Sequence, residues 1–198
     1  MTYNSTSWTT DANTKAGSSG TNTVGGVTLY KEFGLWDFSP TAGVHSPLSS
    51  MNSVYAASST GYVSSGDAFG NGTDPLTALD ISAEVGNRYE VINGMWYIED
   101  SINIDSVRVI ATADGNQSIN FHLYSFAIDF ATNYGDLASG VLLGHIGSSM
   151  SATNDTIKTD TLTIDSSTVN AGRVVLAFAE AETDTTDFTC QMIVKYHL

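Results

Sequence analysis

The chain has 198 residues, which fits one domain or one domain with an added N-terminal region. Its net charge is −14 with only seven Lys and Arg, and phosphate contact needs clustered cations, so nucleic-acid partners are disfavoured. The one cysteine excludes an intrachain disulfide, and no apolar stretch reaches the roughly 18 residues of a membrane-spanning helix.

Residues 1–26 form a polar stretch rich in Gly, Ser, Thr and Asn. Such a stretch predicts an extended arm that is either disordered or ordered against a neighbouring subunit. Tyr3 and Trp8 would be its anchors in the second case, because aromatic side chains carry interface energy when they find pockets. The segment has neither a basic start nor an apolar centre, so a signal peptide is not expected.

Residues 27–86 are expected to be rich in loops. The apolar and aromatic stretch 27–38 predicts a strand. The stretch 39–75 contains all three prolines and repeated Ser and Gly signals, so we interpret it mostly as loop, with a short helix as an alternative at 48–57. Asp74-Pro75 is a good helix start and predicts a short helix that ends before Gly86.

From residue 87 onward, apolar and polar residues alternate as in half-buried strands. Asn93-Gly94 lies between two apolar runs and predicts a two-residue hairpin with positive φ at both turn residues. The alternation changes phase at Asp105-Ser106, which predicts a bulge or a corner, and Asp114-Gly115 predicts a second turn.

Five further strands are expected, and the one at 174–179 is apolar on both faces, which predicts a central, fully buried strand. The full pattern predicts an all-β fold, an antiparallel β-sandwich or jelly roll, with an extended N-terminal arm and at most one or two short helices. The predicted organisation is an arm (1–26), a loop-rich region (27–86) and the sandwich (87–198). The five strands lie near 119–124, 141–143, 157–164, 174–179 and 188–196.

The sequence offers no recognisable catalytic frame, so no catalytic, cofactor-binding or metal-binding residue is predicted, and the protein is not expected to be an enzyme. Cys190 is in phase with the buried face of the last strand and is expected to be a core thiol. The acidic stretch Glu180–Asp187 is either a solvated loop or a calcium-binding loop. The four histidines show no metal-ligand spacing and are expected to be solvated or at a rim: His45, His122, His145 and His197.

Exposed aromatic residues are the remaining candidates for a binding surface. Trp96 and Tyr97 are adjacent on a predicted strand, so they point to opposite faces and only one can belong to the core. The aromatic residues either pack at an interface or stack on sugars. The candidate interface residues are Tyr3, Trp8, Trp36, Trp96 and Tyr97.

The C-terminal part carries a characteristic succession of strands and turns. It contains an Ile/Val-rich strand at Ile104–Ala113, the strand His122-Leu123-Tyr124, the turn Asn170–Arg173 and a last strand ending in Ile193–Tyr196. Over roughly the last 110 residues this pattern resembles small β-sandwich virion proteins of marine tailed phages.

The resemblance implies a virion structural protein that decorates or cements the capsid, with copies of itself and the major capsid protein as partners. It implies a homo-oligomer such as a trimer, located on the capsid surface and made in the host cytoplasm without secretion. No direct nucleic-acid or membrane partner is expected. The alternative is a carbohydrate- or receptor-binding module of a head or tail fibre.

Overall fold

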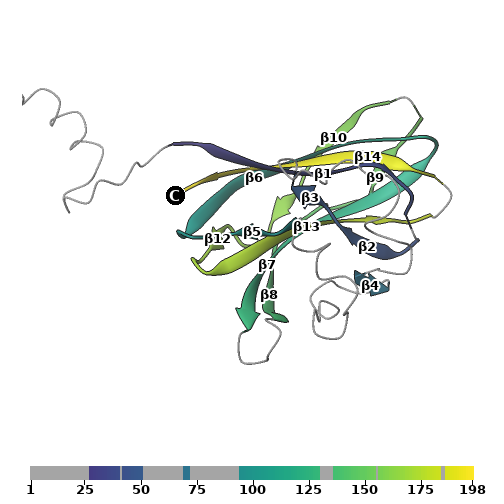
Figure 1. The fold of residues 1–198 in the computed structure, drawn as a ribbon. Coiled ribbons are helices and arrows are strands. Elements are labelled where there is room, and N and C mark those ends of the chain that lie inside the picture. The colour runs from purple at the N-terminus through teal and green to yellow at the C-terminus, as the bar shows by residue number, and fades with distance from the viewer. Residues whose placement is uncertain are drawn as a thin grey trace, which may run out of the picture.

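A computed structural model describes residues 27–40, 42–50, 69–71, 94–129, 136–154, 156–183 and 186–198. Apart from the single helical residue Gly94, every regular element in these ranges is a β-strand, and the strands form two sheets that pack face to face (Figure 1). The expected all-β sandwich is therefore confirmed. The arm 1–26 and the helix expected after Asp74 lie outside the described residues.

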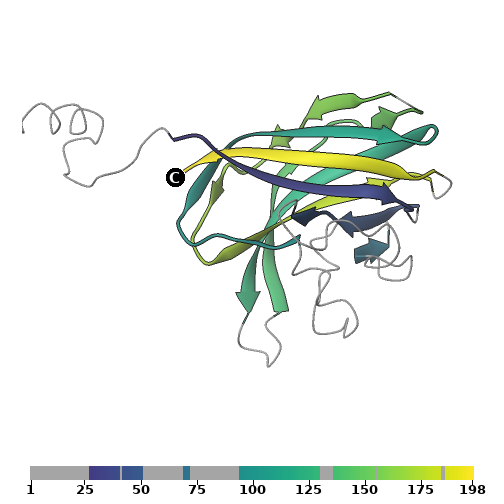
Figure 2. The same cartoon turned by 45° about the horizontal axis from the view of Figure 1, so that its top comes forward.

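The first sheet is built around the C-terminal strand. Its order is β10-β6-β14-β1-β3, with β12 paired to β6 beside this path. Strands β6, β14 and β1 are neighbours at its centre, and Figure 2 shows them side by side. Its strands are β1 (Leu29–Phe38), β3 (Ser49–Ser50), β6 (Ile102–Ala113), β10 (Lys158–Thr161), β12 (Thr168–Val169) and β14 (Phe188–His197).

The second sheet has the order β11-β8-β7-β13-β2-β4, with β5 paired to β13 and β9 paired to β7. All its pairings are antiparallel. Its strands are β2 (Val44–Pro47), β4 (Phe69–Asn71), β5 (Trp96–Tyr97), β7 (Gln117–Asp129), β8 (Asp136–His145), β9 (Met150–Ala152), β11 (Thr163–Ile164) and β13 (Arg173–Ala181).

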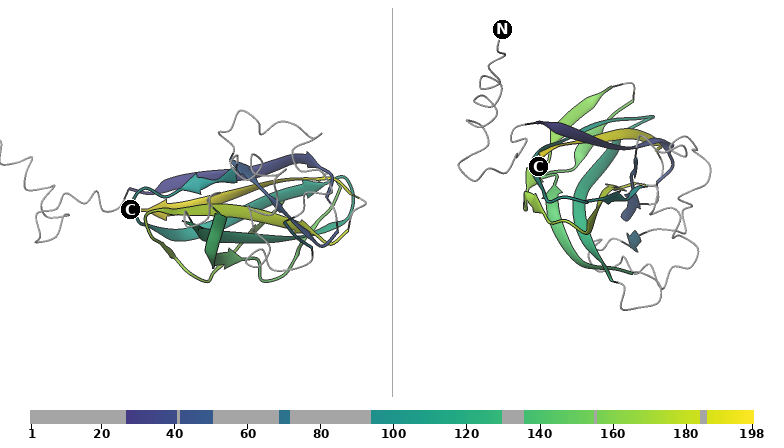
Figure 3. Two further views of the ribbon diagram at one scale, coloured as in Figure 1. Left: turned by 60° about the horizontal axis from the view of Figure 1, so that its bottom comes forward. Right: turned by 60° about the vertical axis from the view of Figure 1, so that its left-hand side comes forward.

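The strand order is that of a jelly roll. Without the short additions, one sheet reads β1-β14-β6-β10 and the other β2-β13-β7-β8. The chain changes sheet from β1 to β2, from β6 to β7 and from β13 to β14, which nests one pair of strands inside the next. The two layers are visible from both directions in Figure 3. Because β1 and β2 each pair with a C-terminal strand, the sandwich begins well before residue 87.

The core lies between the sheets and follows the two-residue alternation of their strands. On the first sheet, Val107, Val109 and Ala111 of β6 face inward beside Cys190, Met192 and Val194 of β14. On the second sheet the inward residues are those of β7 and β13: Ile119, Phe121, Leu123, Val175, Ala177 and Ala179.

The outer face of the second sheet is buried as well. Val174, Leu176 and Phe178 of β13 join Tyr124 and Phe126 of β7 in a second apolar cluster. Strand β13 is therefore buried on both faces and lies between β7 and β2, which confirms the prediction of a central strand. The outer face of the first sheet differs, because it exposes polar and aromatic side chains.

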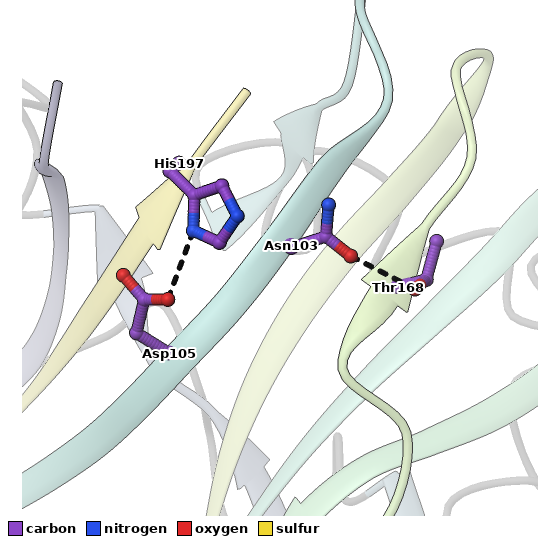
Figure 4. Close-up of polar contacts among 4 residues, drawn as sticks. All are labelled: Asn103, Asp105, Thr168 and His197. Atoms are coloured by element: carbon purple, nitrogen blue, oxygen red, sulfur yellow. Dashed lines mark hydrogen bonds and ion pairs between the residues drawn. The ribbon is translucent and has the colours of Figure 1, made fainter. Parts of the chain in front are cut away.

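The predicted bulge in the Ile/Val-rich strand is present. The register between β14 and β6 shifts at Lys195–Tyr196, which leaves Asp105 as an extra residue of β6. The Asp105 carboxylate reaches His197 Nδ1 of β14 at 2.9 Å (Figure 4). Two residues earlier, Asn103 Oδ1 accepts a hydrogen bond from the Thr168 hydroxyl of β12 at 2.9 Å, as the same figure shows.

The described part of 39–75, which is 39–40, 42–50 and 69–71, is more regular than its prolines suggested, because it contains β2, β3 and β4. Of the helix considered at 48–57, Ser49-Ser50 is instead strand β3, and 51–57 lie outside the described residues. Pro47 pairs with Phe178, and the next residue, Leu48, donates its N–H to Ala177 of β13 at 2.8 Å. Since successive N–H groups point to opposite edges, the missing donor of Pro47 falls on the edge away from β13, where a proline is tolerated.

The Asn93-Gly94 prediction was wrong in its turn geometry. Gly94 does not have a positive φ, and β5 after it pairs with β13, with Trp96 opposite Val175. A Cβ at Gly94 would lie 2.6 Å from the carbonyl oxygen of Leu48. Glycine is needed here for close backbone packing, whereas Gly172, with φ of 82°, supplies the left-handed turn before β13.

The strand expected at 157–164 is two strands in two sheets. β10 pairs with β6 in the first sheet, and β11 pairs with β8 in the second. Leu162 lies between them with its side chain buried, and its N–H bonds to the Val107 carbonyl at 2.9 Å. The chain therefore joins the β10 edge of the first sheet to the β11 edge of the second by changing sheets at a buried leucine.

Candidate functional site on the outer face of the first sheet

An apolar pocket of about 360 Å³ lies on the outer face of the first sheet. Its walls are Trp36 at the end of β1 and Ile157 directly before β10, which are 62% and 76% exposed. Tyr30, also on the outward phase of β1, adds a third large exposed side chain to this face. The pocket is lined by Gly34, Leu35, Trp36, Ile110, Ala111, Thr112, Ile157, Thr189, Cys190 and Gln191.

The register of three strands creates the pocket. Gly34, Gln191 and Ile110 form one cross-strand row, because β1 pairs with β14 and β14 with β6. Thr189 and Thr112 form the next row. Gly34 has no side chain and the side chains of Thr112 and Thr189 are small, so the larger Trp36 and Ile157 stand above a hollow.

Three carboxylates gather at the same end of the sandwich. Asp37 follows Trp36, Asp114 lies in the turn from β6 to β7, and Asp187 precedes β14. One carboxylate oxygen from each lies within 4.8 Å of the others. We call Asp37, Asp114 and Asp187 the carboxylate trio. Oxygen ligands of this kind are those that a hard cation such as Ca²⁺ prefers, so these are the described residues that could hold one.

Backbone contacts position the trio beside the pocket. Asp37 has a φ of 48°, and its N–H bonds to the Thr189 hydroxyl at 3.0 Å. The Ser39 hydroxyl donates to Asp187 Oδ1 at 2.7 Å, and the Asp114 N–H donates to the Asp187 carbonyl at 3.0 Å. Thr189 both lines the pocket and holds Asp37, so the two features share one support.

Gln117 fixes the loop that carries Asp187. Its side chain is buried, and its amide nitrogen donates to the carbonyls of Thr183 at 2.8 Å and Thr186 at 3.1 Å. Its amide oxygen accepts from the Thr183 N–H at 3.2 Å and the Thr183 hydroxyl at 2.9 Å. One side chain of β7 thus holds both sides of the β13–β14 loop.

The sequence candidates fall in different places. Trp36 lies at the pocket, whereas Tyr3 and Trp8 are outside the described residues. Trp96 is half-buried against the core, with its ring centroid 4.7 Å from that of Tyr196. Tyr97 is 53% exposed, which confirms that only one of the adjacent pair packs on the core. Both border a second hollow of about 190 Å³, separate from the Trp36 pocket.

The acids of the Glu180–Asp187 stretch do not converge on one point. Glu180 approaches His45 Nε2 at 3.5 Å, and Glu182 accepts a hydrogen bond from the Ser149 hydroxyl at 2.6 Å. Asp187 joins the carboxylate trio, and Asp184 lies outside the described residues. The acids that do gather come from three distant parts of the chain, so spacing along the sequence gave no signal for them.

The side chains of His145 and His197 are partly exposed, at 36% and 41%, as expected for a rim position, whereas His45 differs from the expectation. His45 is buried, and its ring centroid lies 5.0 Å from that of His122 on the outer face of the second sheet. His145 Nδ1 contacts Asp165 at 2.7 Å, and His197 contacts Asp105. The expectation of a solvated or rim side chain was therefore wrong for His45, because β2 pairs with β13 and the His45 ring packs across β13 against the His122 ring of β7.

Cys190 is confirmed as a core thiol. Its side chain is buried, and burial raises its thiol pKa from 9.0 to about 12. A thiol that stays protonated at neutral pH is a poor nucleophile. Cys190 is therefore part of the packing beneath the pocket.

Ile157, Asp37 and Asp114 were not among the sequence candidates, whereas Asp187 was part of the acidic stretch Glu180–Asp187. Ile157 is a lone aliphatic residue in the polar run Asn154–Thr161, and such isolation was the one local sign of an exposed apolar position.

The sequence matches no protein-family model and no curated protein. No helix among the described residues is long and apolar enough to cross a membrane.

Proposed function

We propose that this protein acts by binding other molecules and not by catalysis, and that its contact surface is the outer face of the first sheet around Trp36 and Ile157. The observation that carries the proposal is the exposure of these two side chains on either side of an apolar pocket. Large apolar groups in water are unfavourable, and an aromatic side chain beside a pocket is a common anchor of protein interfaces.

The role we propose is a phage virion structural protein that decorates or cements the capsid. Its partners are the major capsid protein and copies of itself, and its place is the capsid surface. Three features support this role: the resemblance of the last part of the chain to phage virion proteins, the jelly-roll strand order and the net charge of −14. Jelly rolls recur in viral capsid proteins, although a fold alone does not define a function.

The test compares two exposed aromatic residues. The double variant Trp36→Ala/Ile157→Ser should occupy purified particles at least about tenfold less than the wild type, since anchor residues contribute most of an interface's energy. Tyr97→Ala, an exposed aromatic on the second sheet, is the matched control and should bind normally. Full occupancy by the double variant, with an unchanged melting temperature, would contradict the proposal.

A second candidate function is carbohydrate binding. The specific observation is that Trp36 is followed directly by Asp37 at the rim of the pocket, because sugars are bound by an aromatic ring and neighbouring hydrogen-bond acceptors. A glycan array that shows binding by the wild type, and none by Trp36→Ala, would favour this candidate. An array without any response would favour protein contact.

A further inference from the structure

The size of the Trp36 pocket limits what can enter it. At about 360 Å³ it is near the lower end of the 300–1,000 Å³ that small-molecule sites typically span. Its lining is mainly apolar, and its large outward-facing apolar side chains are Trp36, Ile110 and Ile157. Such a hollow suits one large apolar side chain of a partner better than an extended polar ligand.

Charge at the edge of the pocket adds a second requirement. Asp37 is next to Trp36 in the chain, Asp114 is two residues from Thr112, and Asp187 is two residues from Thr189. At about 3.3 Å per strand residue, the trio is within about 7 Å of the pocket lining along each strand.

None of the ion pairs within the described part of the chain includes these three carboxylates. Their mutual repulsion therefore favours a cation brought by a partner. Both the location of the trio and its charge point to the same kind of ligand.

We propose that the pocket receives a large apolar side chain from a segment of a partner protein, and that Lys or Arg next to it in that segment contacts Asp37, Asp114 and Asp187. This inference rests on the proposed function, since it names the chemistry of the partner at the same surface. The negative charge of the trio also excludes acidic segments and nucleic acid from the pocket. The same complementarity speeds association at low ionic strength.

Three synthetic peptides separate the two requirements: one with a central Arg-Leu-Arg, one with Glu-Leu-Glu and one with Arg-Ser-Arg. Binding is measured by amide resonances of the pocket strands and by tryptophan fluorescence, to which Trp36 contributes together with Trp8 and Trp96. We expect the Arg-Leu-Arg peptide to bind at least about tenfold more tightly than either of the others. The Glu-Leu-Glu peptide lacks the charge contact with the carboxylate trio, and the Arg-Ser-Arg peptide lacks the apolar side chain for the pocket. Its affinity should fall as salt is added.

Isosteric variants test the residues involved. Asp37→Asn/Asp114→Asn/Asp187→Asn removes the charge and retains the shape, and Asn tolerates the positive φ of Asp37. This variant should lower the affinity for Arg-Leu-Arg about tenfold and weaken its salt dependence. Asp100→Asn, an exposed carboxylate away from the pocket, is the control and should bind as the wild type does.

Several outcomes would overturn the inference. Equal affinities for the three peptides, or no change in the pocket resonances at peptide concentrations on the order of 1 mM, would exclude a basic and apolar segment. Peptide binding that disappears on addition of EDTA would indicate a metal ion held by the trio instead. A neutral glycan that binds in a Trp36-dependent manner would identify another occupant.

The proposed function is tested separately from its partner's chemistry. If the peptides fail but particle binding still depends on Trp36, the surface is correct and the occupant is wrong. If particle binding does not depend on Trp36, the proposed function itself fails.

Discussion

Replacement of Gln117 tests how the jelly roll supports the candidate site. In Gln117→Met the side chain keeps its length but loses four hydrogen bonds to Thr183 and Thr186. A net hydrogen bond contributes about 1 kcal/mol, so the upper limit is about 4 kcal/mol. Water can reach part of the loop, and we expect the free energy of unfolding to fall by about 2–3 kcal/mol. For a chain of this size that corresponds to a melting temperature lower by about 4–12 °C.

The assay is reversible urea and thermal unfolding of the wild type and the variant at one pH. Gln191→Met is the control, because Gln191 is half-exposed on the outer face and its replacement should change stability by less than about 0.5 kcal/mol. Hydrogen exchange at the amide of Thr183 should accelerate in Gln117→Met. A loss of stability below about 0.5 kcal/mol with unchanged exchange would refute the assignment of Gln117 as the anchor of the loop.

Three further predictions concern the core and its titration. Phe178→Ala should destabilise by about 3–5 kcal/mol in urea unfolding, as much as Phe121→Ala on the inner face, because both sides of the second sheet are packed; a loss below about 1 kcal/mol would contradict the outer cluster. The Cys190 thiol has its pKa raised to about 12 in the folded chain and ionises near 9.0 when unfolded. Its stabilising contribution is therefore complete below pH 9 and lost as the pH rises toward 12. Relative to Cys190→Ala, the wild type should lose about 1.4 kcal/mol of unfolding free energy per pH unit between pH 9 and 12. Curves of unfolding free energy against pH that run parallel for the two proteins would refute this prediction. Arg173→Met should lower the free energy of unfolding by about 2 kcal/mol, because the guanidinium donates to the Ser125 hydroxyl and carbonyl and to the Ser139 carbonyl. Urea unfolding of the wild type and the variant measures this loss, and an unchanged unfolding midpoint would contradict the prediction.

Local sequence patterns predicted the local features of the strands. The alternation along β6, β7 and β14 identified which side chains face the core, and the change of phase at Asp105-Ser106 identified the bulge. Burial of both faces of 174–179 could be predicted because every residue of this stretch is apolar, and a strand that is apolar on both faces is typical where both faces are buried. These features depend on neighbouring residues and therefore leave a trace in the sequence.

Long-range pairing could not be predicted in the same way. Nothing in residues 29–38 indicates that β1 pairs with β14 at the other end of the chain, and this pairing is what places Trp36 beside Thr189. The carboxylate trio depends on the same crossing of sheets. Asn93-Gly94 shows the opposite error, because a strong hairpin signal coincided with a glycine that is required for contact with Leu48.

The most direct test of binding through the first sheet is site-specific photo-crosslinking on intact particles. A photoreactive phenylalanine analogue replaces Trp36 in one variant and Tyr97 in another, and both are irradiated under the same conditions. If binding occurs through the first sheet, we expect a crosslink to a partner chain from position 36 and none from position 97. Crosslinks of equal yield from both positions, or from position 97 alone, would contradict it.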